Sequence, residues 1–416
     1  MGLFSKKSKP PKQIELSEKN KKVRIILLCV FIVIAVVAFG IGVSSLLTIE
    51  EGWHSIEVDS DELNCGDDFV FDYYFGKDGT PMSEYKNVCN LYSTLATKSY
   101  LIFSAENIAT EVPNLAYLNH HINETVKVDP ALYSAFEQLA KYSSRALYLG
   151  PICATYSDLC LSENESFAEV KDPKRNPEVA EYFSRIIDFI KDPSHIELKL
   201  LDGGQVCLAV SEEYAAFAEE NGFDRFLDFF RIKNAFVVDF LAETMLENGY
   251  SYGAISSYDG YTRTLDQKHV YAYTLFDRRD QVVSAIATLS YQNGGSLVYL
   301  RNYPMSEQES FFYYASERLT IPPMFHSENG LYQTATNGMI GYSKHLGCAE
   351  IVLSLMPLYT AEEVDVAEML ALNVREIATV WCEDHLVCYT DKAFSPELLI
   401  TDGEYAYESV FVTENR

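Results

Sequence analysis

The sequence lacks the short motifs that identify most large enzyme families. It contains no G-x-S-x-G nucleophile turn, no H-E-x-x-H zinc motif, no phosphate-binding P-loop and no G-x-G-x-x-G dinucleotide fingerprint. No C-x-x-C spacing occurs either, which argues against a zinc ribbon or a dithiol redox site. Histidine is scarce at eight residues, and the one adjacent pair, His120 and His121, cannot turn both rings toward one metal from a helix or a strand.

Positive charge is also in short supply, and much of it gathers at one end. The 416 residues include 33 Lys and Arg against 60 Asp and Glu, a net charge of −27. Residues 1–24 hold eight basic and two acidic side chains, a net +6, which leaves −33 for the rest. A surface this acidic repels phosphate backbones, and we therefore expect no nucleic-acid partner. The simpler interpretation of the acidity is solubility in an exposed compartment.

One long hydrophobic run follows the basic tail. Ile25 to Val43 carries no charge, and the apolar character continues to Leu47. A helix of this length crosses the roughly 30 Å of a bilayer core at about 1.5 Å per residue. We expect a single-pass transmembrane helix over 25–47 in the plasma membrane, with the basic tail in the cytoplasm and the main domain outside. Ser44 and Ser45 leave cleavage as a signal peptide open.

Nine cysteines are present, and eight of them lie beyond the hydrophobic run. An even number of cysteines in an oxidising compartment permits disulfides. The pairs to test first are Cys65 with Cys89, and Cys382 with Cys388.

The rest of the chain divides by composition into an acidic spacer over 48–66, one large domain over 67–391 and an acidic tail over 392–416. The hydrophobic content of 48% is enough for a substantial core. Helix-like and strand-like patterns alternate within the domain without a strict βαβ rhythm, which predicts an α+β fold.

Several helices are marked by their first residues. Asp129 and Asn176 each stand before a proline and are expected to cap the helices that follow. A third helix is expected over 232–248, and Thr360 with Glu363 forms a capping box for a fourth.

Strand-like patterns occupy most of the remaining domain. The expected strands form a hairpin over 196–210, runs over 251–258, 269–277, 281–289 and 297–303, a strand over 349–357, and a hairpin over 377–389.

Four stretches occur in an order that points to one family. Residues 118–143 contain Leu-Asn, a short gap, a Val-x-Val strand end and an aspartate-capped helix. Residues 228–239 read D-F-F-R-I-K-N-A-F-V-V-D, 253–261 end in D-G-Y, and 331–338 read L-Y-Q-T-A-T-N-G. This order resembles that of the FAD:protein FMN transferases, the ApbE-like flavin transferases. The family has a first stretch like that at 118–143. At the positions of the other three stretches it has, in order, D-L-G-G-I-A-K-G-Y-A-V-D, N-L-G-G and H-x-x-D-P-x-T-G.

The fourth stretch continues into a further pattern. Behind the expected strand 349–357, where the family has A-D-A-L-S-T-A, the chain reads V-D-V-A-E-M-L. The Asp and Thr of the family pattern help to hold Mg²⁺. The resemblance matches Asp365 to that Asp and places Met369 at the Thr position.

The resemblance implies a single ApbE-like, T-fold-related α+β domain behind the transmembrane helix. It also implies FAD and Mg²⁺ as cofactors, a flavoprotein acceptor as partner, and Asp365 as a metal ligand. The positions implied for cofactor binding are Asp228, Lys233, Asn234, Asp239, Gly260 and Gly338.

The departures from the family pattern fall together at one site. Phe230 and Arg231 replace the two glycines of the D-L-G-G stretch, and glycine there lets a backbone approach phosphates. Asn234 replaces the lysine, and a neutral amide cannot do the work of an ammonium beside a pyrophosphate. Met369 offers a thioether, which is too soft a ligand for Mg²⁺.

These substitutions lead to three hypotheses. The first is a catalytically impaired homologue that acts as a flavin-binding or protein-binding module. The second is an active enzyme that transfers FMN from FAD to a Thr or Ser of an extracytoplasmic flavoprotein. The third is an unrelated structural or interaction domain whose matches arise by chance.

Overall fold

The computed structural model describes residues 49–56, 58, 68–77, 79–109, 113–162, 164–280, 282–292, 294–306, 309, 312–316 and 320–413. The basic tail 1–24, the predicted transmembrane segment 25–47 and Cys65 lie outside these ranges. Within them, no helix combines the length and the hydrophobicity needed to cross a membrane.

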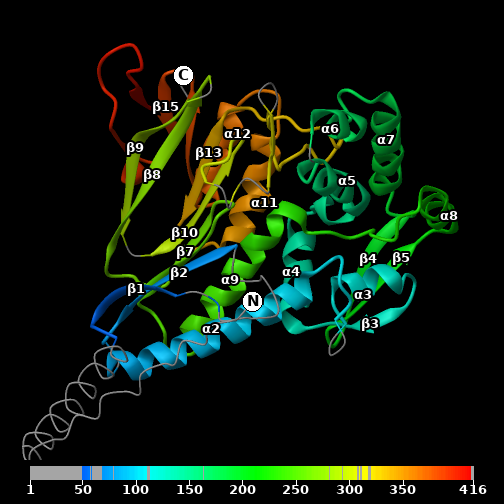
Figure 1. Ribbon diagram of the computed structural model, residues 1–416, viewed down its shortest axis with the longest axis horizontal. Helices are drawn as coiled ribbons and strands as arrows, with labels where there is room; N and C mark the ends of the chain where they lie inside the picture. Colours follow the sequence, from blue (N-terminus) through cyan, green and yellow to red (C-terminus); the bar gives the residue numbers. More distant parts are fainter. Residues whose placement is uncertain are drawn as a thin grey trace, which may run out of the picture.

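A nine-stranded sheet forms the centre of the molecule (Figure 1). Neighbouring strands are antiparallel except for the last pair, which is parallel. In spatial order they are β1 (Gly52–Ile56), β2 (Phe69–Phe75), β6 (Gly253–Ser257), β7 (Tyr261–Thr264), β10 (Gly295–Arg301), β13 (Gly338–Ser343), β14 (Ala378–Glu383), β15 (Leu386–Tyr389) and β17 (Glu408–Phe411).

Two different layers cover the two faces of this sheet. One face packs against the helices α2 (Pro81–Phe103), α9 (Lys233–Glu247), α11 (Cys348–Tyr359) and α12 (Val366–Val374). The other face packs against a three-stranded sheet made of β16 (Pro396–Leu398), β9 (Val282–Gln292) and β8 (Val270–Arg279). Strand β10 shows the two-residue period that this requires, because Val298 and Leu300 join the helix-side core while Leu297 and Tyr299 join the other.

A second group of elements lies to one side of the sheet, on the right in Figure 1. Its small sheet has the order β3 (Thr125–Lys127), β5 (Gln205–Val210) and β4 (Ile196–Leu201). The helices are α3 (Leu115–His120), α4 (Pro130–Lys141), α5 (Gly150–Cys160), α6 (Glu165–Lys171), α7 (Pro177–Lys191) and α8 (Glu212–Asn221). The short pieces along the chain are η1 (Ala146–Tyr148), η2 (Phe230–Ile232), η3 (Lys392–Phe394), β11 (Tyr314–Ala315) and β12 (Thr320–Ile321).

The helix starts predicted at Asp129 and Asn176 are confirmed. The Asp129 side chain accepts a hydrogen bond from the Ala131 N–H, and the Asn176 side chain accepts one from the Glu178 N–H. Both hairpins and the four strands expected between 251 and 303 are also present.

Two predictions in the 349–375 region are wrong. The expected strand 349–357 is helix α11, and Thr360 ends that helix instead of capping the next one. The next helix, α12, is capped by Asp365. Residues 349–357 are mostly apolar, since α11 is buried over most of its surface. The sequence of such a segment does not tell a buried strand from a buried helix.

The expected Cys382–Cys388 disulfide is not formed. Strand pairing sets Cys382 opposite Val387 and Cys388 opposite Trp381, and Cys382 is a free thiol. Adjacent residues of a strand point to opposite faces, which separates these two sulfurs. The Cys65–Cys89 pair stays a prediction, since Cys65 is outside the described ranges.

The stretches expected as spacer and tail contribute strands. β1 pairs with β2, and β17 pairs with β15. The hydroxyl of Tyr407 donates to Asp277 Oδ2 at 2.8 Å, and Phe394 is buried in the core between the sheets. Residues 392–413 therefore pack as part of the domain.

One carboxylate joins α9, α11 and β7. Asp239 accepts hydrogen bonds from the backbone N–H groups of Cys348 at 2.8 Å and Ala349 at 2.9 Å, and from Arg263 Nη1 at 2.8 Å. A Cβ at Gly347 would collide with this carboxylate, so the residue before α11 has no room for a side chain. We call these five residues the Asp239 junction.

Asp239 and Glu243 share Arg263, and we expect them to contribute very different amounts to the free energy of unfolding. Asp239→Ala leaves Arg263 and two helix N–H groups without their buried partner, and we expect a loss of about 3 kcal/mol in the free energy of unfolding. Glu243→Ala removes the exposed partner of the same Arg263, 3.0 Å away, and should cost less than about 1 kcal/mol. Urea unfolding of the two variants measures both values, and equal losses would contradict the role given to Asp239.

Candidate functional site

The turn that precedes α9 keeps a glycine-like shape although it contains no glycine. Phe230 has a φ of +47°, in the left-handed region that costs a residue with a Cβ about 1–2 kcal/mol. The Asp228 carboxylate holds this turn by accepting the Phe230 N–H at 2.7 Å. Burial raises the pKa of Asp228, and Arg225, 3.3 Å away, opposes that rise.

Two aromatic rings enclose the next side chain. The Arg231 guanidinium lies 4.6 Å from the ring centroid of Phe230 and 4.6 Å from that of Phe312. The Phe230 ring in turn packs 5.7 Å from the ring of Phe325. Phe312 and Phe325 therefore lie against the two residues that stand in place of the family glycines, through a cation–π contact with Arg231 and a ring contact with Phe230.

The space left beside these rings is very small. The cavity next to η2, which we call the η2 cavity, has a volume of about 30 Å³ and is lined by residues that include Cys153, Phe230, Arg231, Phe325 and Met356. Sites for drug-sized and cofactor-sized ligands measure about 300–1,000 Å³. The residues present do not fit an FAD molecule at this place.

The positions predicted at the start of α9 have structural partners. Asn234 is buried, and its Nδ2 donates to Asp259 Oδ2 at 3.1 Å. Lys233 is half-buried, and its charge acts on Asp228 to lower the pKa of that carboxyl. The predicted cofactor ligand Asp239 belongs instead to the junction described above, where its oxygens are taken by α11 and Arg263.

The β6–β7 turn places a second acid beside Asn234. Burial raises the pKa of Asp259 to about 6, and the nearby charge of Asp68 acts in the same direction. Among the described residues, Asp259 Oδ1, Asn234 Oδ1 and Arg231 Nε have no hydrogen-bond partner. In the sequence, Asp259 appears only as the Asp of the D-G-Y ending, and nothing there shows that its side chain is partly buried.

The two glycines kept from the family pattern both pack on β10. Gly260 has a φ of +105°, and a Cβ there would collide with the Tyr299 carbonyl. A Cβ at Gly338 would lie 3.0 Å from the Tyr299 ring. Both glycines are required for this close approach, and the structure brings them together through Tyr299.

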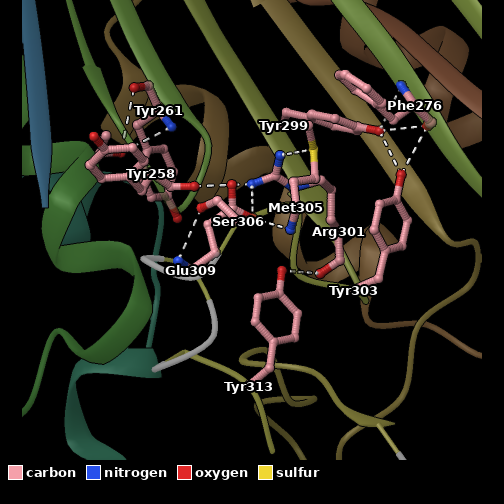
Figure 2. A network of polar contacts seen from close by, with 11 residues as sticks. Tyr258, Tyr261, Phe276, Tyr299, Arg301, Tyr303, Met305, Ser306, Glu309 and Tyr313 are labelled. Carbon is pink, nitrogen blue, oxygen red and sulfur yellow. Dashed lines mark hydrogen bonds and ion pairs between the residues drawn. The ribbon is translucent and has the colours of Figure 1, made fainter. Parts of the chain in front are cut away.

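Arg301, the last residue of β10, lies between these two positions. It is opposite Gly338 in the strand pairing, and its Nη2 donates to the Tyr258 carbonyl in the β6–β7 turn at 3.0 Å. Figure 2 shows its ion pair with Glu309, with 3.0 Å between Nη2 and Oε2. Sequence analysis missed this pair, because nothing in the sequence distinguishes Glu309 among the 60 acidic residues.

Asp365, the predicted metal ligand, caps α12. Its exposed carboxylate accepts the N–H groups of Ala367 at 2.9 Å and Glu368 at 3.1 Å, while Met369 is buried in the core. Over the described ranges, no group of three or more His, Cys, Asp or Glu residues could hold a metal ion. The structure does not bring Asp365 together with the other predicted site residues through any hydrogen bond that it makes.

The helix that directly follows β13 is α11, and it carries an acid and a hydroxyl four residues apart. Glu350 and Ser354 therefore have the same spacing as the Asp and Thr of A-D-A-L-S-T-A, as Asp365 and Met369 also have. Glu350 Oε1 lies 2.8 Å from Lys141 Nζ, and the Ser354 hydroxyl donates to the Glu350 carbonyl at 3.0 Å. The i,i+4 spacing was the available signal, and the expectation of a strand at 349–357 obscured it.

The comparisons with known proteins agree on one fold. The ApbE protein from Thermotoga maritima superposes with a TM-score of 0.55 at 11% identity, covering 83% of this chain and 96% of that one. The flavin transferase ApbE from Vibrio cholerae gives 0.53 at 10% identity, covering 84% and 97%. No protein-family profile and no curated protein match the sequence. The resemblance to ApbE flavin transferases is confirmed for the fold, and a chance match to an unrelated fold is wrong.

The burial of Asp259 predicts an unusual pH dependence of stability. The folded state binds its proton more tightly than the unfolded state, so stability is highest below the ordinary pKa of 3.8 and falls as the pH rises toward about 6. The loss is at most about 3 kcal/mol. Asp259→Asn should remove this loss and make the protein more stable than wild type at pH 7. Urea unfolding between pH 4 and 7 tests this, and parallel curves for the two proteins would contradict it.

Proposed function

We propose that this chain is an ApbE-fold protein that does not transfer flavin and that works as a protein-binding module. The proposal further places it outside the plasma membrane, anchored by the hydrophobic run 25–47 with its basic tail in the cytoplasm. The partner class we propose is an extracytoplasmic flavoprotein, the kind of protein on which a flavin transferase acts.

The observation that carries the proposal is the volume of the η2 cavity. About 30 Å³ remains where the family pattern has two glycines, because Phe230, Arg231 and Phe325 fill the space. That volume holds about one water molecule. A dinucleotide would have to displace buried aromatic side chains, and their burial stabilises the fold by about 1.5–3 kcal/mol each.

The absence of a suitable cation site among the described residues supports the same proposal. Mg²⁺ needs about six oxygen ligands in octahedral geometry. The Glu350 carboxylate already pairs with the Lys141 ammonium, and Tyr142 donates its hydroxyl to the same oxygen at 3.4 Å. Asp365 Oδ1 accepts two N–H groups of its own helix. The described residues therefore do not fit Mg²⁺.

The active-enzyme alternative makes the opposite prediction for FAD. It requires the groove to accept FAD together with Mg²⁺ and to transfer FMN to a Thr or Ser of an acceptor. The two functions are therefore separated by one binding measurement and one labelling measurement.

Calorimetry of the purified full chain with FAD, with and without Mg²⁺, tests the proposal. We expect no binding by the wild type at about 100 μM FAD, which corresponds to less than about 5.5 kcal/mol of binding free energy. The double variant Phe230→Gly/Arg231→Gly removes the two side chains and relieves the strained φ, so any flavin affinity that the fold retains should appear there.

A matched control makes the same two kinds of substitution, Phe to Gly and Arg to Gly, away from the η2 cavity. Phe167→Gly/Arg185→Gly alters an exposed Phe and an exposed Arg on α6 and α7 and should leave FAD binding unchanged. FAD-dependent labelling of a flavoprotein acceptor by the wild type would establish the active enzyme instead and reject the proposal.

A further inference from the structure

The Arg301 side chain is buried and its donors are poorly used. The residue is 4% exposed, and the face of its guanidinium lies 4.9 Å from the Tyr299 ring centroid. Nη2 donates to the Tyr258 carbonyl and to Glu309, whereas Nη1 has the Met305 sulfur, a weak acceptor. Nε has no acceptor among the described residues.

Glu309 occupies the position that an external anion would take. Its Oε2 accepts from Arg301 Nη2 at 3.0 Å and from the Met305 N–H at 2.8 Å, and the residue is 5% exposed (Figure 2). The oxygen thus meets one guanidinium N–H and one backbone N–H, the donor pair that recognises carboxylates and phosphates. Burial raises the pKa of Glu309, and the charge of Arg301 and the hydrogen bond from the Met305 N–H act against that rise.

Among the described residues, Glu309 is the one acid that pairs with Arg301. Tyr313 donates its hydroxyl to the Arg301 carbonyl at 3.2 Å, and Tyr299 covers the guanidinium. Within the described ranges, the salt bridge to Glu309 is the one formed by Arg301. The Arg301 guanidinium is buried, has one carboxylate partner and keeps an unused N–H. It therefore has the features of an anion-binding site that a side chain of the protein itself fills.

We propose that Arg301 and the Met305 N–H form an oxyanion-binding site, which Glu309 fills in the free protein and which accepts a carboxylate or phosphoryl oxygen when the Glu309 carboxylate is displaced. The site lies between the β6–β7 turn and the start of β13, since Arg301 contacts Tyr258 and pairs with Gly338. An incoming planar carboxylate could use both Nη2 and Nε, and Nε is the donor that the single-oxygen contact of Glu309 leaves unused. This inference stands whether or not the chain binds FAD.

Chemical rescue tests the site directly. Glu309→Ala leaves Arg301 buried without its anion, so a small external anion that reaches it should restore stability. We expect the thermal midpoint of the full-length variant to rise saturably in potassium formate, by about 2 °C or more above potassium chloride of equal ionic strength. Potassium phosphate gives a second arm, which separates a site for planar carboxylates from one that also takes phosphoryl groups. Rescue by either anion supports the proposal.

Two control variants make the result specific, and a second Glu309 variant serves if the first does not fold. Glu197→Ala removes the carboxylate from Arg145, a half-exposed arginine 3.0 Å away, and should show no formate effect beyond chloride because water solvates that guanidinium. Arg301→Met/Glu309→Ala should show no rescue. Glu309→Ser opens nearly the same space and gives the same test if the alanine variant does not fold.

The proposal fails on either of two outcomes. One is that formate and phosphate act no more strongly than chloride on both Glu309 variants. The other is that rescue is equal with and without Arg301, which would place the anion elsewhere.

Discussion

The Asp239 junction is the constraint on which the arrangement of this domain depends. One buried carboxylate accepts the first N–H groups of α11 and an arginine of β7, so it sets the start of α11 against α9 and against the sheet. A negative charge at a helix N-terminus also interacts favourably with the helix dipole. Because Gly347 has no side chain, the start of α11 lies directly against this carboxylate of α9. Met356, further along α11, lines the η2 cavity.

A common feature of the candidate residues is that other side chains of the protein already contact them. Phe230 and Arg231 fill space beside the start of α9, the Lys141 ammonium neutralises Glu350, and Glu309 pairs with Arg301. Each contact satisfies a buried or partly buried group that an open binding site would leave unsatisfied. Filled sites of this kind favour stability over ligand capacity, since open, strained sites are costly to maintain.

Much of the fold could be predicted from local patterns. The caps at Asp129 and Asn176 fixed two helix starts, and alternating residues located the strands of both hairpins. The prediction failed at 349–357, because a run that is buried over most of its surface shows only a weak helical period. The family pattern behind that run was matched to Asp365, whose carboxylate caps its own exposed helix.

The sequence by itself determined the elements whose signals are local, namely capped helices, alternating strands and the order of motifs that led to the ApbE-like fold. Only the tertiary structure decided what the polar residues do, because their partners lie far along the chain. Asp239 meets residues 109 and 110 positions away, and Asn234 meets Asp259 across two elements. Burial and partner choice set the charge state and the role of a carboxylate, and neither property is encoded within a short stretch of sequence.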